Sequence, residues 1–162
     1  MNLNDLVPAE AEAALLACCG SHAWARRMTE GRPYADHDAL LEAADRVWWS
    51  LAPEDWREAF AAHPKIGEKK PSGDAQFRRW SEQEQAGVES AESSLLAELA
   101  EANRAYAERF GYIFIVCATG KSVEEMLGLL RARMGNDAET ELRLAAEEQR
   151  KITRLRLLKA ET

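Results

Sequence analysis

The chain has 162 residues and a formal net charge of −7, and 46% of its residues are hydrophobic and 30% charged. This length suits one domain with a substantial core, and the composition is typical of soluble globular proteins. The acidic excess argues against nucleic-acid binding driven by bulk electrostatics. No apolar run is long enough to span a membrane, and the N-terminus does not resemble a signal peptide, so we expect a cytoplasmic protein that does not bind membranes.

Local residues predict where helices begin and end. Ala, Leu, Glu and Arg dominate the sequence and favour helices. Pro8 and Pro53 suit a first helical turn, Ser21 is a good N-cap, and Ser122 with Glu125 has the form of a capping box. Helices are predicted over residues 8–19, 21–30, 38–51, 53–63, 94–109 and 122–134, from residue 81, and from residue 137 nearly to the end.

Residues 112–118 (YIFIVCA) form the single strand-like run. One strand cannot form a sheet by itself, so we interpret this run as a buried extended segment or a short helical link. No repeat, low-complexity tract or linker interrupts the chain. We therefore predict an all-α fold in which residues 1–162 form a single-domain bundle of about seven to eight helices.

The three cysteines are Cys18, Cys19 and Cys117. An odd number, with two of them adjacent, argues against a disulfide framework, so we expect reduced thiols in the core. Neither a C-x-x-C nor an H-x-x-x-H spacing occurs, and no metal site is predicted.

Three histidines are the first candidates for proton transfer near neutral pH. His22 and His37 lie in polar surroundings near expected helix starts, which favours exposed positions. His63 ends a predicted helix and precedes Pro64, which fixes the backbone, and Gly67, which allows a close approach to a ligand. Such a setting suits a proton-transferring residue, although a protonated imidazole stabilised by the helix C-terminal dipole explains it equally well.

Charged positions elsewhere have two interpretations each. Glu84 can complete a capping box that begins at Ser81, which local sequence favours, or it can orient an imidazole. Arg131 and Arg133 can compensate a helix C-terminal dipole, or one of them can bind a carboxylate or urea-like group through its planar fork. Gly-Lys-Ser at 120–122 resembles the end of a phosphate-binding loop, but Ile115 occupies the position of the required glycine, so we reject nucleotide binding.

Several sequence blocks occur in a characteristic order along the chain. They are H-P-x-[IL]-G at 63–67, S-x-x-E-Q-x-G at 81–87, F-G-[FY]-x-F-[IV]-x-C-A at 110–118 followed by 120–122, R-x-x-N at 133–136, and E-x-x-K-I-x-x-L-R-L at 148–157. Taken together, these blocks resemble the 2-oxo-4-hydroxy-4-carboxy-5-ureidoimidazoline (OHCU) decarboxylase family. The match covers nearly the whole chain, and the order of the blocks is more specific than any one of them.

The resemblance implies a helical enzyme without a cofactor that converts OHCU into (S)-allantoin and CO₂ in uric acid degradation. It implies His63 as the proton-transferring residue, Glu84 as its catalytic partner, and a homodimer. Arg133 would bind the ureido or carboxylate portion of the substrate. The substrate site would also include Pro64, Ser81, Gln85, Phe114, Ile115, Val116, Cys117 and Ala118.

The residue types suit this chemistry. Loss of CO₂ leaves a carbanion-like or enolate-like centre, and His63 either deprotonates the substrate hydroxyl or delivers the proton afterwards. Backbone N–H groups of residues 115–118 are candidates to stabilise the developing oxyanion. An apolar wall there would disfavour a buried carboxylate and favour neutral CO₂.

Two other functions compete with this one. The first is a non-catalytic helical interaction module, with a partner surface in the Trp-rich N-terminal half that includes Trp48 and Trp49. A scaffold has no evident need for the combination of His63, Pro64 and Glu84. The second is hydrolysis of 5-hydroxyisourate, which we disfavour because the sequence lacks the β-rich pattern of the transthyretin-like enzyme for that step.

Overall fold

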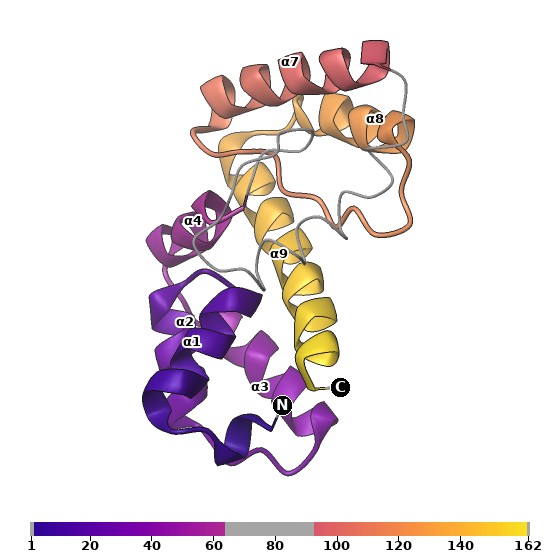
Figure 1. Cartoon of the computed structure of the whole chain (residues 1–162). Coiled ribbons are helices and arrows are strands. Elements are labelled where there is room, and N and C mark those ends of the chain that lie inside the picture. The colour runs from indigo at the N-terminus through magenta and orange to yellow at the C-terminus, as the bar shows by residue number, and fades with distance from the viewer. Residues whose placement is uncertain (1, 64–92, 162) are drawn as a thin grey trace. The chain divides into compact units, whose positions relative to one another are not determined.

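The computed structural model describes residues 2–63 and 93–161 (Figure 1). These two stretches contain no strand, and none of their helices is long and apolar enough to cross a membrane. The prediction of an all-α fold is confirmed. The helices are the 3₁₀-helix η1 (Leu3–Asp5), α1 (Pro8–Cys18), α2 (His22–Glu30), α3 (His37–Trp49), α4 (Pro53–Ala61), α7 (Ser93–Phe110), α8 (Val123–Arg133) and α9 (Ala138–Glu161).

The predicted helix caps form as the sequence indicates. Ser21 Oγ accepts a hydrogen bond from the Trp24 N–H at 3.2 Å at the start of α2. Before α8, Ser122 Oγ accepts from the Glu125 N–H at 3.1 Å, and the Glu125 carboxylate accepts from the Ser122 N–H at 3.3 Å. These three hydrogen bonds satisfy N–H groups that a helix end leaves without intrahelical acceptors. The helix predicted from residue 81 lies outside the described residues.

The described residues divide into two compact units, and α9 contributes to both. The first unit contains residues 2–62 and 149–161, and the second contains residue 63 and residues 93–148. In the first unit α2 contacts α1, α3 and α4. Tryptophans fill its interior: the indole N–H of Trp24 donates to Ala44 O at 3.1 Å, and that of Trp56 donates to Trp48 O at 2.9 Å.

The close packing of the first unit depends on Gly20, two residues before the first residue of α2. A Cβ atom added there would lie 2.4 Å from the Cβ of Ala62, which follows α4. That distance is far below van der Waals contact, so only glycine permits the chain to approach this closely.

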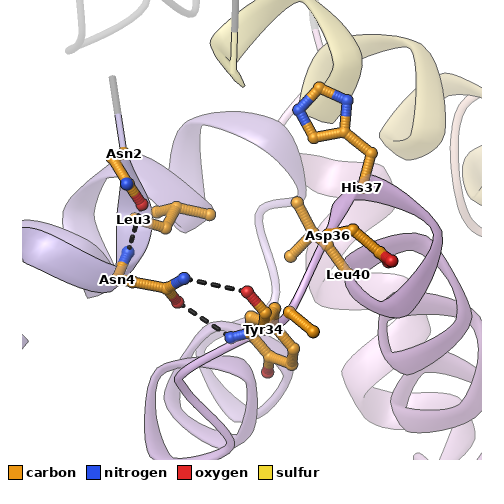
Figure 2. Close-up of a pocket in the computed structure, with 8 residues that line it drawn as sticks. Asn2, Leu3, Asn4, Tyr34, Asp36, His37 and Leu40 are labelled. Atoms are coloured by element: carbon orange, nitrogen blue, oxygen red, sulfur yellow. Dashed lines mark hydrogen bonds between the residues drawn. The ribbon is translucent and has the colours of Figure 1, made fainter.

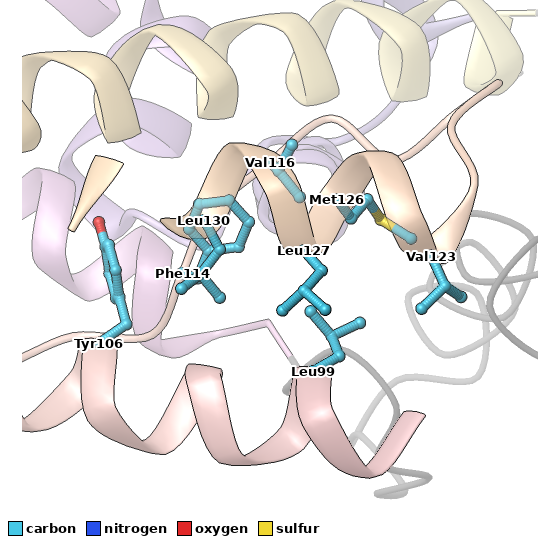
Figure 3. Packing of buried hydrophobic residues seen from close by; sticks show 8 residues of the cluster. All are labelled: Leu99, Tyr106, Phe114, Val116, Val123, Met126, Leu127 and Leu130. Carbon is cyan, nitrogen blue, oxygen red and sulfur yellow. The ribbon is translucent and has the colours of Figure 1, made fainter. Parts of the chain in front are cut away.

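In the second unit α7 and α8 pack against each other around a buried cluster (Figure 3). Residues 113–118 form no helix, so the strand-like run is a buried extended segment, the first of the two structures that we expected for it. Figure 3 shows two of its side chains, Phe114 and Val116, together with the side chains that α7 and α8 contribute to this cluster. The cluster consists of Leu99, Tyr106, Phe114, Val116, Val123, Met126, Leu127 and Leu130.

The three cysteines are buried and none of them is in a disulfide, as expected. Burial raises the pKa of the Cys19 thiol to about 11, because a thiolate would lose its hydration there. Cys19 is therefore an unreactive core residue near neutral pH.

Candidate active site

The candidate site contains the extended segment Phe114–Ala118, whose first four residues are at most 8% exposed. Glycines in the left-handed conformation lie on both sides of it, Gly111 with φ +85° and Gly120 with φ +78°. Side chains other than glycine rarely adopt this conformation. The two glycines let the backbone leave α7, cross the unit in extended form and turn again before α8.

Charged side chains satisfy the backbone of this segment, which has no neighbouring strand among the described residues. Arg133 Nη1 donates to Ile115 O at 2.7 Å, and Lys121 Nζ donates to Cys117 O at 2.8 Å. The Cys117 N–H donates to Glu148 Oε1 at 2.9 Å. A buried backbone group without a partner would cost about 1–3 kcal/mol, so these bonds fix where the segment lies.

These contacts remove one of the backbone N–H groups of residues 115–118 that we expected as candidates for oxyanion stabilisation; the others stay predictions. The Cys117 N–H already donates to the Glu148 carboxylate, so it is not available to a developing oxyanion. Lys121 binds a backbone carbonyl of the same segment, which agrees with our rejection of a phosphate-binding loop at residues 120–122.

Arg133 is held in one orientation at this segment. Its guanidinium carbon lies 4.5 Å from the centre of the Phe114 ring, and its Nε and Nη2 lie 2.8 and 2.5 Å from Glu141 Oε2. Together with the bond to Ile115 O, three of its N–H groups donate to described residues. A guanidinium has five N–H groups, so two remain for other acceptors.

Glu141, in the first turn of α9, is the centre of a buried polar network. It is 0% exposed, and its carboxylate also accepts hydrogen bonds from the Tyr106 hydroxyl and from Asn136 Nδ2, the latter at 3.1 Å. Burial, and then the hydrogen bond to Glu141, raise the pKa of Tyr106, so the neutral phenol donates. An anion near a helix N-terminus also has a favourable interaction with the helix dipole.

Sequence reasoning missed Glu141, Tyr106 and Glu148 as parts of the candidate site. Glu141 shares a helical stripe with Ala145 and Ile152, both buried in α9. A carboxylate on an apolar stripe is the pattern that could have revealed it, because a buried charge requires a partner.

The predicted catalytic residue His63 lies two residues after the end of α4, at a bend, and is half-buried. Its predicted partner Glu84, and the predicted substrate-binding residues Pro64, Ser81 and Gln85, lie outside the described residues. The structure thus brings Arg133 together with the segment Phe114–Ala118, and the remaining predicted contacts of the site stay predictions.

The other two histidines are exposed, as the sequence indicates. The His22 side chain is 68% exposed, and its Nδ1 lies 2.7 Å from Glu58 Oε2. His37 lies at the edge of a pocket of about 340 Å³ in the first unit, lined by residues 2–4, 34–37 and 40 (Figure 2). None of the predicted site residues lines this pocket. Among the described residues no group of His, Cys, Asp and Glu could hold a metal ion.

Comparison with known proteins identifies the family. The sequence profile of the family described as OHCU decarboxylase matches residues 4–158. The chain belongs to the OHCU decarboxylase family. The predicted order of sequence blocks is therefore confirmed as a family relationship over almost the whole chain.

Similar proteins include one that is named as a bifunctional protein and one that is named as a decarboxylase. The chain is 43% identical over 145 residues to "Uric acid degradation bifunctional protein TTL" of Arabidopsis thaliana, covering 88% of this chain and 44% of that protein. It is 35% identical over 130 residues to a 2-oxo-4-hydroxy-4-carboxy-5-ureidoimidazoline decarboxylase of Amia calva, covering 78% of this chain and 73% of that protein. The chain thus spans less than half of the Arabidopsis relative.

A solved structure has the same fold. It is a crystal structure of OHCU decarboxylase in the presence of (S)-allantoin, with a TM-score of 0.78 and 38% sequence identity. The match covers 89% of this chain and 94% of that one.

Proposed function

We propose that this protein catalyses the decarboxylation of OHCU to (S)-allantoin and CO₂, without a cofactor, as a step of uric acid degradation. The observation that carries the proposal is the family match over residues 4–158. The solved OHCU decarboxylase of 38% identity, crystallised in the presence of (S)-allantoin, supports the same reaction.

The reaction requires one proton to be delivered to carbon. When the bond to the carboxylate breaks, its electron pair stays on the ring, CO₂ leaves, and the ring carbon that bears the ureido group takes up a proton. The ring hydroxyl loses its proton and becomes the carbonyl of allantoin, and the ring nitrogen that was double-bonded to the ureido-bearing carbon takes up a second proton as that double bond is lost. We assign the proton transfer to His63 and its orientation to Glu84, since an imidazole can both accept and donate a proton near neutral pH.

The described part of the site supports an apolar environment for the step that releases CO₂. Phe114, Ile115 and Val116 are 2%, 2% and 6% exposed. An apolar wall favours neutral CO₂ over the carboxylate from which it forms. We propose that this segment, Cys117 and Ala118 line the substrate site with Pro64, Ser81 and Gln85, and that the two remaining N–H groups of Arg133 bind substrate.

A coupled assay tests the proposal. Urate oxidase and hydroxyisourate hydrolase generate OHCU from urate, and circular dichroism then follows the appearance of (S)-allantoin. We expect rapid formation of the S enantiomer with this protein, and a loss of about 10²–10⁴-fold in rate for His63→Ala. His37→Ala is the matched control, because it removes an exposed imidazole and should retain full activity. Racemic allantoin formed at the spontaneous rate by the wild-type protein would refute the proposal.

We also propose that the protein is a homodimer in the cytoplasm. Light scattering coupled to size-exclusion chromatography should give twice the mass of 18.1 kDa. A monomer mass at micromolar concentration would contradict the dimer, and recovery in the membrane or secreted fraction of the source cells would contradict the location.

A further inference from the structure

Asn103, in α7, is a buried polar residue that the family resemblance did not single out. It is 3% exposed, and neither its Nδ2 nor its Oδ1 has a hydrogen-bond partner among the described residues. An amide buried without a hydrogen bond costs about 1–3 kcal/mol. Most buried polar side chains are paired, so an unpaired carboxamide at this position calls for a function.

The position of Asn103 in α7 connects it with the candidate site. It lies one helical turn from Leu99 and one from Tyr106, and both of these are fully buried in the cluster between α7 and α8 (Figure 3). Residues three and four apart share one helix face. The Tyr106 ring contacts Phe114 edge-on, with ring centres 5.3 Å apart, and Phe114 carries the Arg133 guanidinium on its face.

The charges around this face favour a neutral ligand group. The guanidinium of Arg133 is balanced by the buried carboxylate of Glu141, and Tyr106 is held as a neutral phenol. Because the Glu141 carboxylate balances its charge, Arg133 can donate hydrogen bonds in fixed directions without adding a net positive charge to the site. A catalyst also gains nothing from strong binding of the carboxylate that must leave, because binding the ground state does not lower the barrier.

A carboxamide matches one particular group of the substrate. It presents an N–H donor beside a C=O acceptor, and a ureido group presents the same pair in reverse. A carboxylate only accepts hydrogen bonds, so it would leave the Asn103 carbonyl oxygen facing a negative charge. We propose that Asn103 is a further substrate-binding residue, whose carboxamide pairs with the neutral ureido group. This assignment rests on the proposed function, because it takes OHCU and allantoin as the ligands.

A cycle of two proteins and two ligands tests the pairing. The ligands are (S)-allantoin and hydantoin, which is the same ring without the ureido substituent, and calorimetry measures binding to the wild-type protein and to Asn103→Leu. We expect the wild-type preference for allantoin to fall by about 10-fold or more in Asn103→Leu, and kcat/KM for OHCU to fall by about 10²-fold, since a site built to hydrogen-bond a group loses that discrimination when the partner is removed.

Stability measurements separate this function from a structural one. Asn103→Leu should be at least as stable to urea as the wild-type protein, because it removes an unpaired buried amide. Leu99→Met is the matched control: it changes packing one turn away on the same face, removes no polar group, and should keep the ligand preference. If Asn103→Leu fails to fold, Asn103→Ala serves for the same comparison.

The outcomes distinguish this inference from the proposed function. Unchanged kcat/KM and an unchanged ligand preference in a folded Asn103 variant would overturn the role of Asn103 while the decarboxylase stands. A wild-type protein that does not turn over OHCU would overturn the proposed function. In that case, loss of the preference for allantoin over hydantoin in the Asn103 variant would still support the pairing of Asn103 with a ureido group. A wild-type protein that shows no preference for allantoin would overturn this pairing.

Discussion

Side chains hold two non-helical parts of this protein in place, and they do so in different ways. The first part is the link between α2 and α3. There the Asn4 carboxamide binds the backbone of Tyr34 through both its N–H and its C=O, each at 2.9 Å (Figure 2). Arg32 Nη1 donates to Leu3 O at 2.7 Å and Leu6 O at 2.6 Å. In the second unit the segment Phe114–Ala118 is held by Arg133, Glu148 and Lys121.

The difference between the two parts is burial. Asn4 is exposed, so water can replace the bonds that it makes. Arg133 is 9% and Glu141 0% exposed, so the second arrangement places an ion pair where water cannot replace a lost partner. Removing one member of a buried pair leaves an uncompensated charge, which is far more costly than losing an exposed bond. Water can therefore replace the exposed hydrogen bonds between Asn4 and Tyr34, whereas the second unit depends on the buried pair of Arg133 and Glu141.

The largest effect is expected from Glu141→Ala. It leaves the Arg133 guanidinium buried without its carboxylate, and the free energy of unfolding should fall by about 3–5 kcal/mol. Urea denaturation measures the change. The control is Glu98→Ala, which removes the exposed partner of Arg131 at 3.2 Å and should cost less than about 1 kcal/mol. Equal losses in the two variants would mean that burial does not distinguish these pairs.

A smaller effect is expected from Tyr106→Phe, which removes one donor to the Glu141 carboxylate. Loss of a hydrogen bond to a charged group should cost about 1.5–3 kcal/mol at neutral pH. The raised pKa of Tyr106 also gives a pH dependence: its contribution is complete below the ordinary phenol pKa of 10.0 and is lost as the pH rises further. Urea denaturation between pH 7 and 11 should therefore show a steeper alkaline decline for the wild-type protein than for Tyr106→Phe. Parallel curves would contradict this role.

Glu148→Ala tests the backbone of the extended segment itself. It removes the acceptor of the Cys117 N–H, and we expect a loss of about 1–3 kcal/mol together with a lower kcat/KM. Lys121→Met is the comparison, because it removes a donor to Cys117 O, and an unpaired carbonyl is tolerated better than an unpaired N–H. A larger loss in Lys121→Met than in Glu148→Ala would reverse the order that we expect.

The smallest effect is expected from Asn4→Ala. Both hydrogen bonds to Tyr34 are exposed, so we expect a loss of about 1 kcal/mol or less and unchanged decarboxylation. Asn4→Asp retains an acceptor for the Tyr34 N–H and should lie between the wild-type protein and Asn4→Ala. Thermal unfolding followed by circular dichroism measures both. A loss above about 3 kcal/mol would place this contact in the same class as the buried pair.

The sequence by itself determined the helices and the family. Pro8, Ser21, Pro53 and the pair Ser122 and Glu125 act within one helical turn, so their effect can be read without knowledge of the fold. The order of the sequence blocks identified the family because that order is a property of the sequence and can be recognised without the fold. Periodicity left two structures open for residues 112–118, since an apolar run fits a buried strand-like segment and a buried helix equally well.

Only the tertiary structure decided how the candidate site is held. Glu141 lies 35 residues from Tyr106 and 8 from Arg133, and Glu148 lies 31 from Cys117. No local pattern connects residues at such separations. Folding brings them together because a buried carboxylate, a guanidinium and a backbone N–H each require a partner that water no longer supplies. The unpaired amide of Asn103 could also be recognised only there, because its burial, and not its place in the sequence, makes it unusual.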